Sequence, residues 1–124
     1  MTIPVERMRA LRWGHELLAE IQEDPKLPKR LKRRAKEIAL HYPAPLELVR
    51  LLEANADELP HELGVAINDA ARLFNELRCS RYGTEQTRRS LVFTLRHYPA
   101  YAAESIKARF GTAGGLTYWL APED

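Results

Sequence analysis

The sequence contains a single cysteine, Cys79, in 124 residues. One cysteine cannot form a disulfide within the chain, and this usage is typical of a reducing compartment, so we predict a cytoplasmic location. The first residues lack the apolar segment of a signal peptide, and no apolar run approaches the roughly 18 residues of a membrane-spanning helix. The sequence therefore predicts no membrane association.

Sequence motifs of the common enzyme classes are missing too. There is no glycine-rich loop ahead of a helix, no Cys-x-x-Cys pair and no His-Glu-x-x-His pattern. Lys and Arg total 19 and Asp and Glu total 17, which leaves a net charge of +2 and no general field to favour a polyanionic partner. We accordingly predict no catalytic residues, no cofactor and no metal.

What the sequence does contain is an internal repeat. His-Tyr-Pro-Ala occurs at residues 41–44 and again at residues 97–100, a shift of 56 residues. The same shift pairs further residues upstream: Ala10 with Ala66, Leu17 with Leu73, Leu18 with Phe74, Glu20 with Glu76 and Ile21 with Leu77. A fixed internal period indicates that the structural unit is about half the chain.

Prolines and glycines divide the chain into six segments whose apolar residues recur at helical spacing. We expect helices at about residues 4–23, 28–41, 45–52, 61–78, 84–98 and 100–110. The predicted fold is all-α: a compact six-helix bundle of two pseudo-symmetric three-helix repeats, residues 3–54 and 60–110, within a single domain over residues 1–124. If a rotation near twofold relates the repeats, the first and fourth helices should face each other.

The second predicted helix has a strongly basic face. Its apolar residues Leu27, Leu31, Ala35 and Ile38 share one side, which leaves the wider side to cations. The candidate binding residues there are Lys29, Arg30, Lys32, Arg33, Arg34 and Lys36. Phosphate backbones, acidic proteins and anionic lipids can all bind such a face, although most charge runs simply face solvent.

The equivalent helix of the second repeat has lost much of this charge. Apolar residues stand there instead, at Leu91, Val92 and Phe93. We therefore expect this helix to be more deeply buried than its basic counterpart.

The tail, residues 111–124, belongs to neither repeat and is rich in large apolar side chains, namely Leu116, Tyr118, Trp119 and Leu120. One interpretation is that it folds back over the core of its own chain. The other is that Tyr118 and Trp119 are binding residues for a partner or a second subunit. A tail of this composition is too apolar to predict as disordered.

Two symmetric pairs of polar residues have both a structural and a functional interpretation. His41 and His97 could meet as metal ligands, but two histidines fall short of a four-ligand zinc site, and His-Tyr-Pro suits the end of a helix. Glu20 and Glu76 could form an acid–base pair. We expect instead that each carboxylate pairs with an arginine of a neighbouring helix.

The N-terminal half carries a family resemblance. Met-Thr-Ile-Pro-Val-Glu-Arg-Met-Arg-Ala-Leu is followed by His-Glu-Leu-Leu-Ala-Glu-Ile, Asp-Pro-Lys-Leu-Pro, Arg-Arg-Ala-Lys and Leu-His-Tyr-Pro, all within residues 1–50. This series resembles a small family of uncharacterised proteobacterial proteins that begin Met-Thr-x-Pro-x-Glu-Arg-x-Arg-Ala. The resemblance ends near residue 50 and includes no catalytic motif. It implies a bacterial origin and a helical fold, and it suggests an inhibitor or regulator associated with mobile elements.

Together these features predict a small non-catalytic bacterial protein that acts by binding another macromolecule, in the first instance a protein. The alternative is a nucleic-acid-binding regulator that uses the basic second helix. An enzyme is the least favoured class.

Overall fold

Five α-helices form the framework of the part of the chain that the structure describes. The computed structural model describes residues 3–54, 56, 59–99, 116 and 119–123. Its helices are α1 (Pro4–Glu23), α2 (Lys29–Ala39), α3 (Pro45–Glu53), α4 (His61–Arg78) and α5 (Glu85–Leu95). These residues contain no strand, so the all-α prediction is confirmed, with five helices rather than six; the predicted helix at residues 100–110 lies outside the described residues. None of the five helices is long and apolar enough to cross a membrane.

Proline determines where most of these helices begin. It is the first helical residue of α1 and α3 and the N-cap residue of α2 and α4, at Pro4, Pro45, Pro28 and Pro60. Its fixed φ suits the first turn, and its missing N–H is not needed there. In α5 the cap is a side chain, because the hydroxyl of Thr84 accepts a hydrogen bond of 3.2 Å from the backbone N–H of Thr87.

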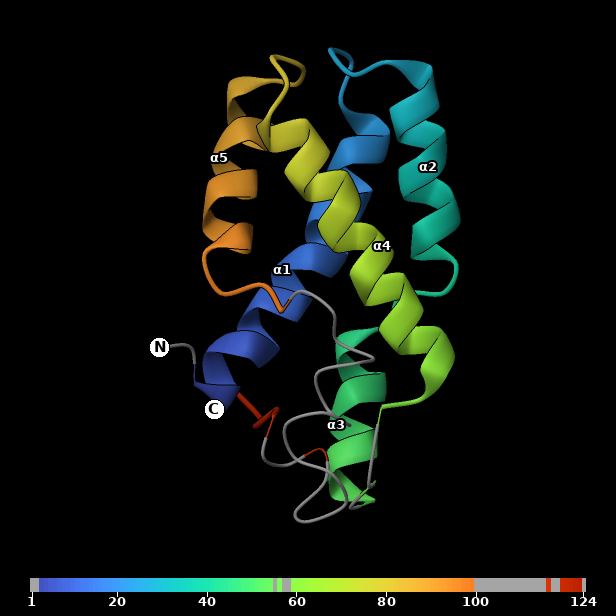
Figure 1. Ribbon diagram of the computed structural model, residues 1–124, viewed down its shortest axis with the longest axis vertical. Helices are drawn as coiled ribbons and strands as arrows, with labels where there is room; N and C mark the ends of the chain where they lie inside the picture. The colour runs from blue at the N-terminus through green and yellow to red at the C-terminus, as the bar shows by residue number, and fades with distance from the viewer. Residues whose placement is uncertain (1–2, 55, 57–58, 100–115, 117–118, 124) are drawn as a thin grey trace.

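The helices are arranged around a crossing of α1 and α4 (Figure 1). Both α1 and α4 make their most extensive contacts with α2 and α5, and they contact each other only over a short stretch. The expected contact of α1 with α4 is therefore limited to their crossing and does not extend along the two helices. α3 lies beyond α2, near the first residues of α4 (Figure 1).

The core lies between α1 and α4 and the two helices that cover them. The leucines and aromatics that the repeat pairs together are all fully buried: Leu17, Leu18, Ile21, Leu73, Phe74 and Leu77. Burial of each such side chain contributes on the order of 1.5–3 kcal/mol to folding. These residues form a single hydrophobic cluster with the apolar sides of α2 and α5.

α2 and α5 bury the same three positions of their sequences. The buried residues are Leu31, Ala35 and Ile38 in α2, and Thr87, Leu91 and Thr94 in α5. Val92 and Phe93 consequently lie toward solvent, 64% and 55% exposed. The expectation of a more deeply buried α5 is therefore wrong for these two residues, because α5 presents to the core the same face as its basic counterpart.

The described part of the tail packs against the core of its own chain. Leu116, Trp119 and Leu120 are buried, with Trp119 only 3% exposed. The guanidinium of Arg7 on α1 donates a hydrogen bond of 2.7 Å to the backbone carbonyl of Trp119. The indole of Trp119 is thus part of the core rather than a surface for a partner, while Tyr118 lies outside the described residues.

A buried carboxylate joins the end of α1 to the beginning of α5. Asp24 is 4% exposed, and its two oxygens accept hydrogen bonds from the backbone N–H groups of Lys26, at 2.8 Å, and Thr84, at 2.9 Å. Burial raises the pKa of Asp24, but hydrogen bonds from Thr87, Thr84 and Lys26 outweigh it and hold the pKa below its usual range. The charged form of Asp24 therefore stabilises the junction.

Asp24→Asn should lower the free energy of unfolding by about 1–3 kcal/mol at neutral pH, because an amide has one acceptor oxygen where the carboxylate has two. Since the folded pKa is depressed, the stabilisation by the charge is complete above the unfolded value of 3.8 and is lost as the pH falls through the folded pKa. The difference in unfolding free energy between wild type and variant, measured with urea, should narrow below about pH 4. A difference that stays constant into acid would contradict the role given to the charge.

Candidate functional site

The buried Tyr42 and the partly buried Tyr98 meet between α1 and α4. The Tyr42 hydroxyl lies 2.8 Å from the backbone carbonyl of Leu11 on α1, and the Tyr98 hydroxyl lies 3.0 Å from that of Ile67 on α4. The two hydroxyl oxygens are 3.2 Å apart. The tyrosines thus connect the backbone of α1 to that of α4, which explains why the two helices do not pack face to face.

The tyrosine pair has two hydroxyl protons for three oxygen–oxygen contacts. When Tyr42 donates to Leu11, Tyr98 can donate to Ile67 or to the Tyr42 oxygen, but not fully to both. Burial raises the pKa of both hydroxyls, and the neighbouring Tyr42 raises that of Tyr98 further. Both tyrosines therefore stay protonated and have a structural role.

A small residue makes room for this pair. A Cβ atom on Gly14 would lie 2.5 Å from the Tyr42 hydroxyl oxygen and 2.8 Å from a ring carbon of Tyr98. Real Cβ atoms do not come this close to buried aromatic groups. Glycine in the middle of α1 is therefore required by the close approach of the two rings.

Among the described residues, a first surface groove lies between α1 and α5. Its volume is about 410 Å³, and it is lined by Trp13, Glu16, Leu17, Glu20, Ser90, Phe93 and Thr94. Leu17 and Thr94 are buried, whereas Phe93 is more than half exposed. The hydroxyl of Ser90 donates to the carboxylate of Glu20, whose oxygens lie 3.0 and 3.3 Å away.

The second groove lies between α2 and α4 and has a volume of about 750 Å³. Its described lining is Arg34, Glu37, Ile38, Leu40, His41, His61, Glu62, Val65, Ala66, Asp69 and Arg72. The Arg34 guanidinium forms an ion pair with Glu76, and Arg72 forms one with Asp69 at 3.5 Å. This groove therefore carries charges of both signs, already paired in part within the chain.

The repeat shift of 56 residues relates the two grooves. It carries Trp13, Glu16, Ser90 and Phe93 of the first groove to Asp69, Arg72, Arg34 and Glu37 of the second. It also carries the contact of Ser90 with Glu20 onto the ion pair of Arg34 with Glu76. Equivalent places in the two halves thus hold different chemistry.

The basic face of α2 is largely open to solvent. Lys29, Arg30, Arg33 and Lys36 are exposed, and Lys32 and Arg34 are partly buried. Arg34 differs from the others because its guanidinium is paired with Glu76 of α4. The six residues predicted as one basic surface therefore comprise four exposed cations, the partly buried Lys32, and Arg34, which pairs with Glu76.

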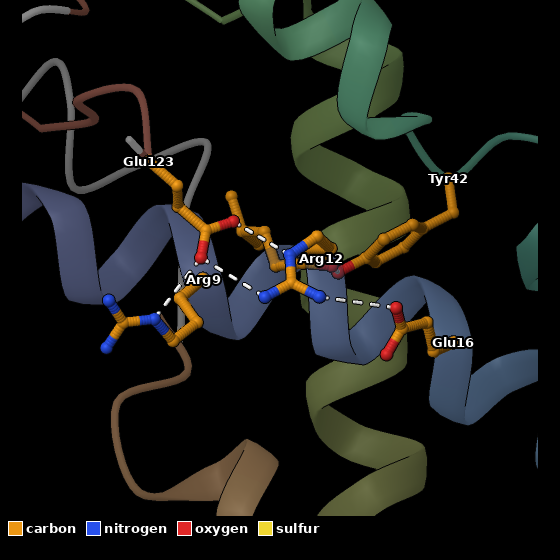
Figure 2. Close-up of polar contacts among 6 residues, drawn as sticks. Arg9, Arg12, Glu16, Tyr42 and Glu123 are labelled. Carbon is orange, nitrogen blue, oxygen red and sulfur yellow. Dashed lines mark hydrogen bonds and ion pairs between the residues drawn. The ribbon is translucent and has the colours of Figure 1, made fainter.

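The end of the described tail is fastened to α1 by charge (Figure 2). Glu123 reaches over the helix, and its oxygens lie 3.2 Å from Nε of Arg9 and 2.8 Å from Nε of Arg12. The hydrogen bond from Arg12 holds the pKa of Glu123 below its usual range and raises that of Arg12. On its other side Arg12 contacts Glu16 at 3.3 Å, which places Glu16 at the end of this network and at the edge of the α1–α5 groove.

The other polar candidates from the sequence have separate partners. His97 pairs with Glu6 at 2.8 Å, whereas His41 lines the α2–α4 groove. Among the described residues, no three His, Cys, Asp or Glu side chains are placed to hold a metal ion. Of the two carboxylates expected to pair with arginines, Glu76 does so, but Glu20 bonds to Ser90 instead.

Comparison of the chain with protein-family models, with curated proteins and with solved structures finds no match.

Sequence reasoning missed the tyrosine pair, although its signal was present. Tyr42 and Tyr98 stand in the repeated His-Tyr-Pro motif, in which the histidines were considered as metal ligands. The two grooves had no comparable signal. They depend on how α1 and α4 cross, which the spacing of apolar residues does not determine.

Gly14→Ala should destabilise the protein by about 1–3 kcal/mol, because the added methyl group overpacks the tyrosine pair. The sign is informative, since alanine is otherwise favoured over glycine inside a helix by about 1 kcal/mol. In a double-mutant cycle measured by urea unfolding, Tyr42→Phe should recover part of the loss, because it removes the oxygen nearest the new methyl group. An additive cycle, or a stabilised Gly14→Ala variant, would contradict the described packing.

Proposed function

We propose that this protein acts without catalysis by binding another protein, and that it does so through the α1–α5 groove and the adjoining exposed face of α5. The observation that carries the proposal is the exposure of Val92 and Phe93. Each exposed large apolar side chain forfeits on the order of 1.5–3 kcal/mol of burial free energy, which a partner surface could recover. The partly exposed Trp13 extends this apolar surface across the groove.

The other half of the chain supports this interpretation. At the positions equivalent to Val92 and Phe93, α2 has Lys36 and Glu37, which are exposed charged residues. A helix face that tolerates charge at these positions has no structural need for apolar residues there. Aromatic residues are also the type enriched at the centres of protein interfaces.

A second candidate function is nucleic-acid binding through the basic face of α2. It is favoured by four exposed cations, Lys29, Arg30, Arg33 and Lys36, on the outer side of one helix. Phosphate contacts from such residues supply most of the affinity in non-specific binding. Against it, α2 has no aromatic residue beside these cations that could stack on a base.

We further propose that the chain consists of two three-helix repeats related by a pseudo-twofold axis between Tyr42 and Tyr98. In support, Leu11–Tyr42 and Ile67–Tyr98 are the same contact displaced by the repeat shift, each spanning 31 residues. The equal buried positions of α2 and α5 and the paired grooves support it as well. A bacterial origin, a cytoplasmic location and a regulatory role toward mobile elements stay predictions.

The protein-binding proposal is tested by photo-cross-linking from the proposed surface. With p-benzoylphenylalanine in place of Phe93, irradiation in an extract of the source cells should yield a defined adduct that protease removes and nuclease does not. The matched control carries the same group in place of Glu37, the equivalent position of α2, and should give no such adduct. Added to the variant with the photoreactive group at position 93, Val92→Glu should abolish the adduct while shifting stability by no more than about 0.5 kcal/mol, since the site is at the surface. Equal adducts at both positions, or none at either, would overturn the proposal.

The nucleic-acid candidate predicts a steep salt dependence. On a duplex DNA probe followed by fluorescence anisotropy, the logarithm of the affinity should fall with the logarithm of salt concentration by about 0.9 per phosphate contacted. Arg30, Arg33 and Lys36, changed together to Glu, should abolish binding without disturbing the Arg34–Glu76 ion pair. Undetectable or salt-insensitive binding would assign this face to solvent.

A further inference from the structure

The α1–α5 groove combines aromatic walls with negative charge. Trp13 and Glu20 stand on one side of α1, two turns apart, and Phe93 faces them from α5. Its described lining includes two carboxylates, Glu16 and Glu20, and no cation. This composition differs from that of the α2–α4 groove, where arginines stand among the carboxylates.

Of the two groove carboxylates, Glu20 has a charge that its described contacts do not neutralise. Glu20 accepts from the hydroxyl of Ser90, which is a neutral donor with one proton. Glu16 contacts Arg12 at 3.3 Å, but Arg12 is bound more closely by Glu123 at 2.8 Å. Because Glu123 also pairs with Arg9, these two arginines balance Glu123 and Glu16, and the uncompensated negative charge of the groove is that of Glu20.

The second groove shows what such a carboxylate holds when a basic residue is present. Glu76 is the equivalent of Glu20, and there the position of Ser90 is taken by Arg34, whose guanidinium pairs with the carboxylate. Where α2 supplies Arg34 to Glu76, α5 supplies only the short Ser90 to Glu20, beside an open groove of about 410 Å³. The missing element on the α1 side is thus an arginine side chain.

We propose that the α1–α5 groove binds an arginine side chain of the protein partner, with the guanidinium on Glu20 and Glu16 and the side-chain stem between Trp13 and Phe93. A guanidinium suits this environment, because it pairs with carboxylates in a planar fork and stacks on aromatic faces. The cavity volume falls in the range of sites that enclose small ligands. This inference rests on the proposed protein-binding function and gives the chemistry of its central contact.

The direct test uses N-acetylarginine methylamide as the probe and nuclear magnetic resonance of the ¹⁵N-labelled protein as the readout. The probe should shift the Trp13 indole N–H and the Ser90 and Phe93 amide signals in a saturable manner. N-acetylcitrulline methylamide, which has nearly the same shape without the charge, should leave them unchanged. Shifts spread evenly over the acidic surface, or equal responses to both probes, would overturn the inference.

Two substitutions sharpen this test. Glu20→Gln should weaken probe binding at least fivefold, whereas Glu76→Gln, the matched change at the equivalent position of α4, should leave the Trp13 and Ser90 responses intact. Ser90→Arg should block the groove, because the new arginine would pair with Glu20 as Arg34 pairs with Glu76. It should not lower the melting temperature. If Ser90→Arg folds and still binds the probe at wild-type strength, the inference is wrong.

The same variants separate this inference from the proposed function. In the cross-linking experiment, with the photoreactive group at residue 93, Glu20→Gln should reduce the yield of the partner adduct at least fivefold. An undiminished yield of adduct would support protein binding and contradict the arginine inference. If the protein with the photoreactive group at residue 93 and Glu20 unchanged gives no adduct, both the proposed function and the arginine inference are wrong.

Discussion

The contact between the hydroxyls of Tyr42 and Tyr98 sets the geometry on which the rest of the molecule depends. It lies between α1 and α4 and joins their backbones through Leu11 and Ile67. Because two aromatic rings stand there, the central helices contact each other only over a short stretch, and α2 and α5 each pack against both. Gly14 of α1 has no side chain, which leaves room for the two rings. The two grooves follow from this arrangement, since each is a space between one central helix and one covering helix.

In the proposed repeat, the two halves differ in the residues that they present to solvent. Equivalent positions face the core in α2 and α5, so their outward positions have been free to carry different chemistry. The first half places cations outward on α2, and the second places Val92 and Phe93 outward on α5. A shared core therefore explains why the fold tolerates both surfaces, and the difference between them is where function is to be sought. The paired grooves carry the same contrast, with an internal arginine beside one carboxylate and a serine beside the other.

Charge fastens the elements that apolar packing alone would leave weakly fixed. Asp24 holds the beginning of α5 against the end of α1, and Glu123 holds the tail across Arg9 and Arg12. The carboxylate of Asp24 is almost fully buried and satisfied by backbone donors, so its contribution exceeds that of an exposed ion pair. Arg12 contacts both Glu123 and Glu16, which connects the tail to the edge of the α1–α5 groove.

The sequence by itself determined the all-α class, the beginnings of the helices and the buried sides of α1, α2 and α4, because these depend on local signals: proline at a first turn, a threonine cap, apolar residues at helical spacing. It also determined the repeat shift, as a correspondence between residue types in the two halves of the sequence. Only the tertiary structure decided that the tyrosines rather than the histidines of the repeated motif meet, that Phe93 faces solvent, and that Trp119 lies in the core. These outcomes depend on the angle at which α1 and α4 cross, and that angle is set by contacts between residues far apart in the chain.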